Sequence, residues 1–253
     1  MVTIMNSTLK KCAAIAFLLV ITTLQPSMAQ EIAYDLSAFK KIVVSPKINL
    51  ILEKGDRESI RLTYANVSPD KINIQVRHKT LRLFLDDARV TERNEKVGWY
   101  GKRSIYNEVI ITAYVTYIDL EHLEIRGNQE LTCNGPIQAE KFTLRAYGEN
   151  EVRLSSVKTA YLKTSLYGEN KLVIKGGKAQ FQKYRLYGQN HIDSRELKSF
   201  ATAATSYGES KIKLNTQDNL RISAFGESRI SYLGNASINR GLIFGDTKIN
   251  KAY

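Results

Sequence analysis

The stretch that decides the fold is LYGEN, residues 166–170, because near copies of it recur at an almost fixed interval. The chain has AYGEN at residues 146–150, LYGQN at 186–190 and SYGES at 206–210. Aligned on this glycine, the repeat runs through Gly127, Gly148, Gly168, Gly188, Gly208, Gly226 and Gly245. A period of about 20 residues is typical of a solenoid, in which each repeat forms one turn of a coil.

Apolar residues alternate with polar ones within each repeat, which is the pattern of β-strands that bury one face. The position four residues after the glycine is always aliphatic: Leu131, Val152, Leu172, Ile192, Ile212, Ile230 and Ile249. Leucine-rich repeats have a similar period, but they carry a helical segment, and these repeats show no 3.6-residue apolar stripe. The sequence therefore predicts an all-β fold, a parallel β-helix with about seven coils of ~20 residues.

The glycine and the residue two after it predict a corner in each coil. Glycine allows the chain to turn with a positive φ. The residue two after it is Asn150, Asn170, Asn190, Ser210, Ser228 or Thr247. These polar residues have the parity of the core positions, so we expect them to bond neighbouring backbone groups and one another along the stack.

An aromatic column precedes the glycine, with the parity of outward-facing positions. Its members are Tyr147, Tyr167, Tyr187, Tyr207, Phe225 and Phe244. Equivalent residues of successive coils lie one strand spacing apart, so we expect the rings to stack on one face. The column has two interpretations: a platform for sugar rings or another partner, or a stack that only covers its own sheet.

A charged column follows the glycine. Its members are Glu149, Glu169, Gln189, Glu209, Glu227 and Asp246. Two residues further on most positions are basic, and we expect them to neutralise the column. Divalent-cation sites are the alternative, but the Gly-rich nonapeptide of calcium-binding solenoids is absent from the sequence. We therefore predict no metal and no cofactor.

Residues 1–29 have the pattern of a secretory signal peptide. Lys10 and Lys11 precede the apolar run 13–24, and PSMA at residues 26–29 has a small-x-small cleavage pattern. A membrane anchor is the alternative, but the apolar run falls short of the roughly 20 residues that a spanning helix needs. We therefore predict export to the periplasm, the cell surface or the medium, with no integral membrane segment after cleavage.

Residues 30–107 are also β in character but lack the repeat. Alternating apolar runs at residues 42–52, 60–64, 72–76 and 81–85 predict strands, with turns at 53–56 and 77–80. The open end of a β-helix exposes strand edges and interior side chains, so it must be covered. We predict that residues 30–107 cap the solenoid and that residues 108–253 form its repeats.

Residues 86–107 are polar and charged, and we interpret them as a long surface loop. Trp99, Tyr100 and Arg103 form an aromatic–cationic cluster in its middle. This cluster is a candidate partner site, and the alternative is a tryptophan that packs back onto the sheet. The candidate partner-binding residues are therefore Trp99, Tyr100, Arg103, Tyr147, Tyr167, Tyr187 and Tyr207.

The formal net charge is +12 at pH 7, of which the predicted signal peptide holds two lysines. A basic exported protein favours anionic partners such as acidic polysaccharide, lipid head groups or nucleic acid. A merely solvated surface is the alternative, and the even spread of basic residues along the chain favours it. We predict no nucleic-acid partner. Cys133 is the one cysteine after residue 29, so we expect no intrachain disulfide and a buried thiol.

Three stretches in this order carry a resemblance to a known family. They are FKKIVVSPKINLILEKGDRESIRLTYAN (39–66), EVIITAYVTYIDLEHLEIRGNQEL (108–131) and ISYLGNASINRGLIFGDTKINK (230–251), with Gly-x-Asn turns between the last two. The chain resembles the head GIN domain family, also described as "putative autotransporter adhesin", of exported proteins from Bacteroidota. The resemblance implies a right-handed, single-stranded β-helix and brings no catalytic residues with it.

Cleavage of a polysaccharide would need carboxylates that converge beside a groove. The best acidic pair, Asp86 and Asp87, is adjacent in sequence, and adjacent strand residues point to opposite faces. We therefore predict a non-catalytic binding or adhesion module that presents β-helix faces to a glycan or protein partner in the cell envelope. The alternatives are a structural or oligomer-forming envelope protein and, less favoured, a polysaccharide-active enzyme.

Overall fold

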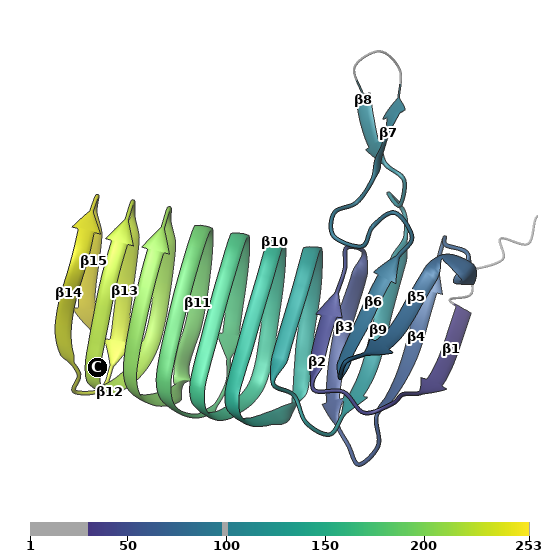
Figure 1. The fold of residues 1–253 in the computed structure, drawn as a ribbon. Helices are drawn as coiled ribbons and strands as arrows, with labels where there is room; N and C mark the ends of the chain where they lie inside the picture. The colour runs from purple at the N-terminus through teal and green to yellow at the C-terminus, as the bar shows by residue number, and fades with distance from the viewer. Residues whose placement is uncertain (1–29, 98–100, 253) are drawn as a thin grey trace, which may run out of the picture.

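The computed structural model describes residues 30–97 and 101–252, and β-strands dominate it (Figure 1). The N-terminal strands are β1 (Gln30–Asp35), β2 (Lys41–Val44), β3 (Ile48–Lys54), β4 (Ser59–Ala65), β5 (Ile72–Arg77), β6 (Thr80–Leu85), β7 (Asn94–Val97), β8 (Gly101–Ser104) and β9 (Ile110–Tyr117). A 3₁₀ turn, η1 (Pro69–Lys71), precedes β5. The repeats form β10 (His122–Ile174), β11 (Gly177–Tyr207), β12 (Ser210–Phe225), β13 (Ser228–Leu233), β14 (Ser237–Phe244) and β15 (Thr247–Lys251).

The repeats wind into a solenoid of parallel strands, as the sequence predicts. β10 pairs with β11 in parallel, and each residue lies beside its equivalent one repeat later, as Tyr167 does beside Tyr187 and Asn170 beside Asn190. β11 pairs with β12 in the same way. Figure 1 shows the coils side by side, from the N-terminal strands to β14 and β15 at the far end.

The solenoid has about five turns, fewer than the seven that the glycines predict. Each glycine marks one corner, and seven corners bound at most six repeats. The segment around Gly127 rests on the N-terminal strands β2 and β3 instead of on another repeat. β14 and β15 form the outermost layer at the other end. The number of corners therefore exceeds the number of complete turns.

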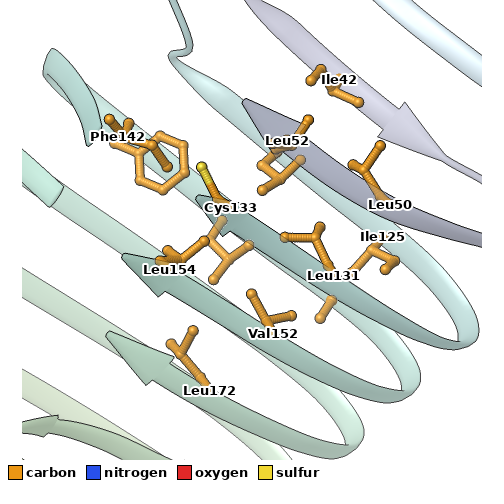
Figure 2. Close-up of a cluster of buried hydrophobic side chains, with 14 of the residues drawn as sticks. Ile42, Leu50, Leu52, Ile125, Leu131, Cys133, Phe142, Val152, Leu154 and Leu172 are labelled. Carbon is orange, nitrogen blue, oxygen red and sulfur yellow. The ribbon is translucent and has the colours of Figure 1, made fainter. Parts of the chain in front are cut away.

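The core is a set of aliphatic columns inside the coils. Leu131, Val152 and Leu172 are fully buried, and Figure 2 shows them in successive coils. Cys133 and Leu154 form part of the neighbouring column and are also buried. Each fully buried side chain of this size contributes roughly 1.5–3 kcal/mol. The predicted inward parity and the buried thiol are both confirmed.

The N-terminal strands extend the parallel stack before they close it. β2 lies in parallel between β6 and β10, and β3 lies in parallel between β9 and β10. Leu50 of β3 therefore lies beside Leu131 of the first repeat. Antiparallel strands then cover this end, because β4 and β1 continue the sheet beyond β9, and β5 pairs with β6.

Residues 86–107 are more ordered than the predicted loop. β7 and β8 form an antiparallel pair, and Figure 1 shows this hairpin standing out from the body. The interpretation as a loop missed these strands because each has four residues and little apolar alternation. Trp99 and Tyr100 lie outside the described residues, as does the predicted signal peptide. No helix in the described ranges has the length and apolar character to cross a membrane.

Candidate functional site

At the glycine corner, the backbone of each coil lies directly against the backbone of the preceding coil. Gly188 has a φ of 94°, and a Cβ placed on it would lie 2.5 Å from the carbonyl oxygen of Gly168. A larger residue there would suffer both an unfavourable backbone conformation and a collision with the coil beneath. The repeated glycine therefore sets the close spacing on which the two columns beside it depend.

A ladder of asparagine side chains lies under this corner. The Nδ2 of Asn150 donates to the Oδ1 of Asn170 at 3.0 Å, and the Nδ2 of Asn170 donates to the Oδ1 of Asn190 at 3.3 Å. Asn150 and Asn190 also donate to the backbone carbonyls of Tyr147 and Tyr187. All three asparagines are 4% exposed. The predicted polar ladder is confirmed, and hydrogen bonding compensates the burial of these amides.

The asparagine ladder ends at its N-terminal side in unsatisfied polar atoms. Gln129 occupies the equivalent position of the preceding repeat and is 5% exposed. In the described part of the chain, neither amide atom of Gln129 has a hydrogen-bond partner, and neither has the Oδ1 of Asn150. Buried polar groups are nearly always hydrogen-bonded, so this end retains unused bonding capacity.

The aromatic column forms a continuous stack, as predicted. Ring centroids are 4.9 Å apart between Tyr147 and Tyr167, 4.8 Å between Tyr167 and Tyr187, and 5.1 Å between Tyr187 and Tyr207. The planes of these pairs differ by at most 5°. The stack continues through Phe225 to Phe244. We call this column the tyrosine ladder.

The tyrosine ladder does not present ring faces along its length. Each inner ring is covered on both sides by its neighbours, so ring edges and phenol groups line the surface. Burial raises the pKa of the Tyr147 phenol, which therefore stays protonated at neutral pH. A sugar ring could stack only on the free faces at the two ends, which limits the platform interpretation.

A groove of about 790 Å³ follows the other side of the glycine corner. One wall includes Glu149, Glu169, Glu209 and Glu227, the opposite wall includes Lys171, Lys211 and Arg229, and the asparagine ladder lies between them. Every residue that lines the groove is polar. The groove spans several coils, from Gln129 at one end to Asp246 at the other.

The two walls of the groove remain largely unpaired. The Oε1 of Glu151 lies 2.7 Å from Lys171 Nζ, and hydrogen bonding to this lysine lowers the pKa of the Glu151 carboxyl. Lys248 and Asp246 form a second pair at 3.7 Å. Glu149, Glu169, Glu209 and Glu227 form no ion pair with any described side chain. The predicted neutralisation of the acidic column is therefore limited to Asp246 at its end.

The acidic wall does not assemble into a metal centre. Among the described residues, no three His, Cys, Asp or Glu side chains lie together as metal ligands would. Carboxylates in successive coils point along one line, whereas a metal site needs several ligands to converge on one point.

A second set of exposed aromatic residues was missed by the sequence reasoning. Tyr161 and Phe181 stack at 5.3 Å and are 51% and 41% exposed, and Phe200 is 54% exposed. The 20-residue separation of Tyr161 and Phe181 is visible in the sequence. Alignment on the glycine corner does not reveal this second column, because Tyr161 and Phe181 lie at the opposite end of the same strands.

The remaining predicted site residue lies apart from the tyrosine ladder. Arg103 is exposed on β8, and its Nη2 lies 4.0 Å from Glu108 Oε1. β8 belongs to the hairpin that stands out from the body (Figure 1). Its suggested neighbours Trp99 and Tyr100 lie outside the described residues, so the proposed cluster stays a prediction.

Residues 38–236 match the family described as "Putative auto-transporter adhesin, head GIN domain". The chain belongs to the head GIN domain family. This membership confirms the resemblance that the sequence carries. No curated protein matches this head GIN domain chain.

Solved structures of similar fold include several from Bacteroidota. A "putative adhesin" from Bacteroides fragilis NCTC 9343 has a TM-score of 0.71 at 18% identity, over 90% of this chain and 98% of that one. A "putative adhesin" from Parabacteroides merdae ATCC 43184 has a TM-score of 0.66 at 15% identity, over 89% and 96%. A "Putative lipid binding protein" from Parabacteroides distasonis ATCC 8503 has a TM-score of 0.59 at 14% identity, over 89% and 97%. At these identities the likeness shows the head GIN domain fold alone.

Proposed function

We propose that this head GIN domain protein is an exported, non-catalytic adhesion module that binds a glycan in the groove beside the tyrosine ladder. One observation carries the proposal: the groove of about 790 Å³ crosses several coils and is lined entirely by polar side chains. Adhesion agrees with the description of the family, and export rests on the predicted signal peptide.

A glycan fits such a groove better than a protein segment does. Sugar hydroxyls both donate and accept hydrogen bonds, so they can satisfy amides, carboxylates and ammonium groups alike. Protein partners usually bind through apolar or aromatic anchors in desolvated pockets, and no apolar side chain lines this groove. The exposed amide of Gln189 lies in the groove and offers the ligand both a donor and an acceptor.

The arrangement of the carboxylates in the groove supports a non-catalytic role. Glycoside hydrolysis needs two carboxyl groups whose environments differ, so that one donates a proton while the other stays ionised. Most carboxylates of the groove instead repeat in one line, in nearly equivalent positions of successive coils. The other two, Glu130 and Glu151, pair with basic side chains. Asp86 and Asp87 offer no alternative, because they form the turn that ends β6, where Asp87 has a φ of 57°.

Binding to an array of immobilised oligosaccharides tests the proposal. Gln189→Leu removes an exposed amide from the groove and keeps a side chain of similar size, so it should lower the affinity for the array ligand by about tenfold. The same change should leave the free energy of unfolding within about 0.5 kcal/mol of the wild type, because Gln189 is exposed. The exposed Gln180→Leu makes the same chemical change away from the groove and should bind like the wild type.

Two outcomes would overturn the proposal. Wild-type protein that binds no glycan on the array would refute glycan adhesion, and capture of a protein partner instead would assign adhesion to a protein ligand. Equal affinities of the wild type and Gln189→Leu would place the site away from the groove.

A further inference from the structure

A second surface lies on the strands that precede the glycine corner, across the tyrosine ladder from the groove. Residues 161–167 and 181–187 pair in parallel, and residues 141–147 hold the equivalent place one coil earlier, where Tyr147 stacks on Tyr167. Leu162, Leu166 and Leu186 are buried, so the residues between them face outward. We call this surface the cationic face. Its basic residues are Lys141, Arg145, Lys163, Lys183 and Arg185.

Aromatic columns border the cationic face on both sides. Tyr161 and Phe181 lie at the start of the strands, and Tyr167 and Tyr187 of the tyrosine ladder lie at their end. Between them Lys163 lies directly beside Lys183. The outward positions of the three strands contain no acidic residue.

The cations of this face have almost no partners within the protein. Arg145 lies 3.8 Å from Glu124, and no other basic residue of the cationic face forms an ion pair with a described side chain. The pKa of Lys163 is lowered, first by desolvation and then by the neighbouring cations Arg185, Arg145, Lys141 and Lys183. Lys163 therefore lies in a positive field produced by its neighbouring cations.

Such an arrangement weakens the isolated fold. Parallel strands lie about 4.7–4.9 Å apart, and like charges directly opposite one another in a sheet are destabilising. The opposite side of the same coils shows the contrast, because Glu151 there lies within 2.7 Å of Lys171 and of Arg153. Anions from outside the protein would relieve the repulsion on the cationic face.

We propose that the cationic face binds an acidic polysaccharide whose carboxylate or sulfate groups pair with the basic side chains of successive coils. The cationic face is distinct from the groove. The inference goes beyond the proposed function because the ligand of this face is a polyanion. A linear polysaccharide with one charge per sugar unit matches a face on which each of the three coils presents at least one cation.

The structure favours a polysaccharide over two other polyanionic surfaces. Single-stranded nucleic acid binds by stacking its bases on open aromatic faces, and the inner rings of the tyrosine ladder are covered on both sides. Membrane-binding surfaces combine basic residues with apolar side chains that insert among the lipids. Here the outward positions between the aromatic borders hold only Lys, Arg, Ser and Thr.

The experiment compares three forms of the protein on immobilised polygalacturonate and heparin. Lys163→Gln/Lys183→Gln/Arg185→Gln removes three charges from the cationic face. Lys71→Gln/Arg77→Gln/Lys79→Gln removes the same charges from exposed positions around β5 and β6.

Wild-type binding should weaken as salt is added, because the ion pairs with the polymer are exposed to solvent. The first variant should bind at least one of the two polymers about tenfold more weakly than the wild type. The second should stay within about twofold of it.

The fold of each variant is checked by its thermal unfolding midpoint. Removing Lys163 and Lys183 relieves repulsion, so this midpoint should be unchanged or higher. A charge-retaining variant, Lys163→Arg/Lys183→Arg, should bind like the wild type.

Four results would overturn the inference: no wild-type binding to either polymer, equal losses in both triple variants, binding that salt does not weaken, or tighter binding to single-stranded DNA or to phosphatidylglycerol vesicles. Failure of the groove is recognised separately, because Gln189→Leu and the neutral sugars of the array report only on that site.

Discussion

Asn150 donates a hydrogen bond to Asn170 at 3.0 Å, although the two residues lie a full repeat apart in the chain. Both are buried at the same corner of successive coils, and Asn170 repeats the contact with Asn190. Polar side chains in a core usually require local partners, and here the partner is the same residue of the next coil. The ladder thereby ties the register of each coil to that of its neighbours.

Asn170→Ala should destabilise the protein by about 1–3 kcal/mol. The change removes the acceptor of Asn150 and the donor to Asn190, which leaves buried amide groups unpaired. Urea unfolding followed by circular dichroism measures the effect. The exposed Asn239→Ala should stay within about 0.5 kcal/mol of the wild type. Equal stabilities of the two variants would show that the ladder contributes nothing.

Gly188→Ala should cost at least about 2 kcal/mol. The residue has a φ of 94°, and the added Cβ would lie 2.5 Å from the carbonyl oxygen of Gly168. Gly176→Ala is the matched control, because its Cβ would meet its nearest atom, the oxygen of Ser155, at 3.5 Å. Chemical denaturation of both variants should separate them clearly, and a Gly188→Ala protein as stable as Gly176→Ala would contradict the backbone-on-backbone corner.

Tyr167→Ala should remove about 1–3 kcal/mol, because it breaks the stacking of two ring pairs at about 0.5–1.5 kcal/mol each. A double-mutant cycle with Tyr187→Ala should give a coupling energy of about 1 kcal/mol. Tyr34 is 52% exposed and lies outside the tyrosine ladder, so Tyr34→Ala paired with Tyr167→Ala should show no coupling. Zero coupling between Tyr167 and Tyr187 would mean that the stacked rings contribute only as separate side chains.

The Glu124 carboxylate should make stability depend on acid pH. Hydrogen bonds from His122 and Arg126 hold the pKa of this largely buried carboxyl at about 2, below its usual 4.5. Because the folded state lowers the pKa, the stabilisation is complete above about pH 4.5 and is lost as the pH falls toward 2.

Glu124→Gln should therefore be less stable than the wild type by about 3 kcal/mol at pH 7, and the difference should vanish near pH 2. Urea titrations at pH 7, 4 and 2.5 measure it. Glu196→Gln, at an exposed position, should follow the wild type throughout. A gap between Glu124→Gln and the wild type that does not change with pH would assign the loss to packing instead of charge.

The sequence was sufficient for most of what recurs with the glycine. The period predicted the parallel coils, the buried column of Leu131 and its equivalents, the asparagine ladder and the tyrosine stack, because stacking converts a spacing in sequence into contact in space. The sequence did not predict features whose residues occupy different positions of the repeat. Lys163 and Arg185 look scattered along the chain, yet the coil brings them to one face.

The N-terminal region shows a second limit. β2 and β3 stack in parallel on β10 as further layers of the coil, but β2 and β3 lack the glycine corner and the 20-residue period. Their positions depend on long-range pairing between Ile42 and Leu123 and between Leu50 and Leu131, which local alternation does not reveal. The acidic column was predicted to be neutralised, but charge pairing depends on side-chain reach. Among its described members only Asp246 has a cation within 4 Å, the Nζ of Lys248 at 3.7 Å.

The coils touch only the coil before and the coil after, and this has a consequence for how such a protein changes length. An in-frame duplication of one repeat would insert a ring, an amide and a set of surface charges while leaving the contacts elsewhere intact. The affinity for a polymeric ligand would then increase stepwise with the number of repeats, because each inserted repeat contacts one more segment of the ligand. In this architecture, duplication of repeats can therefore change the length of the binding surface and its affinity without altering any single pocket.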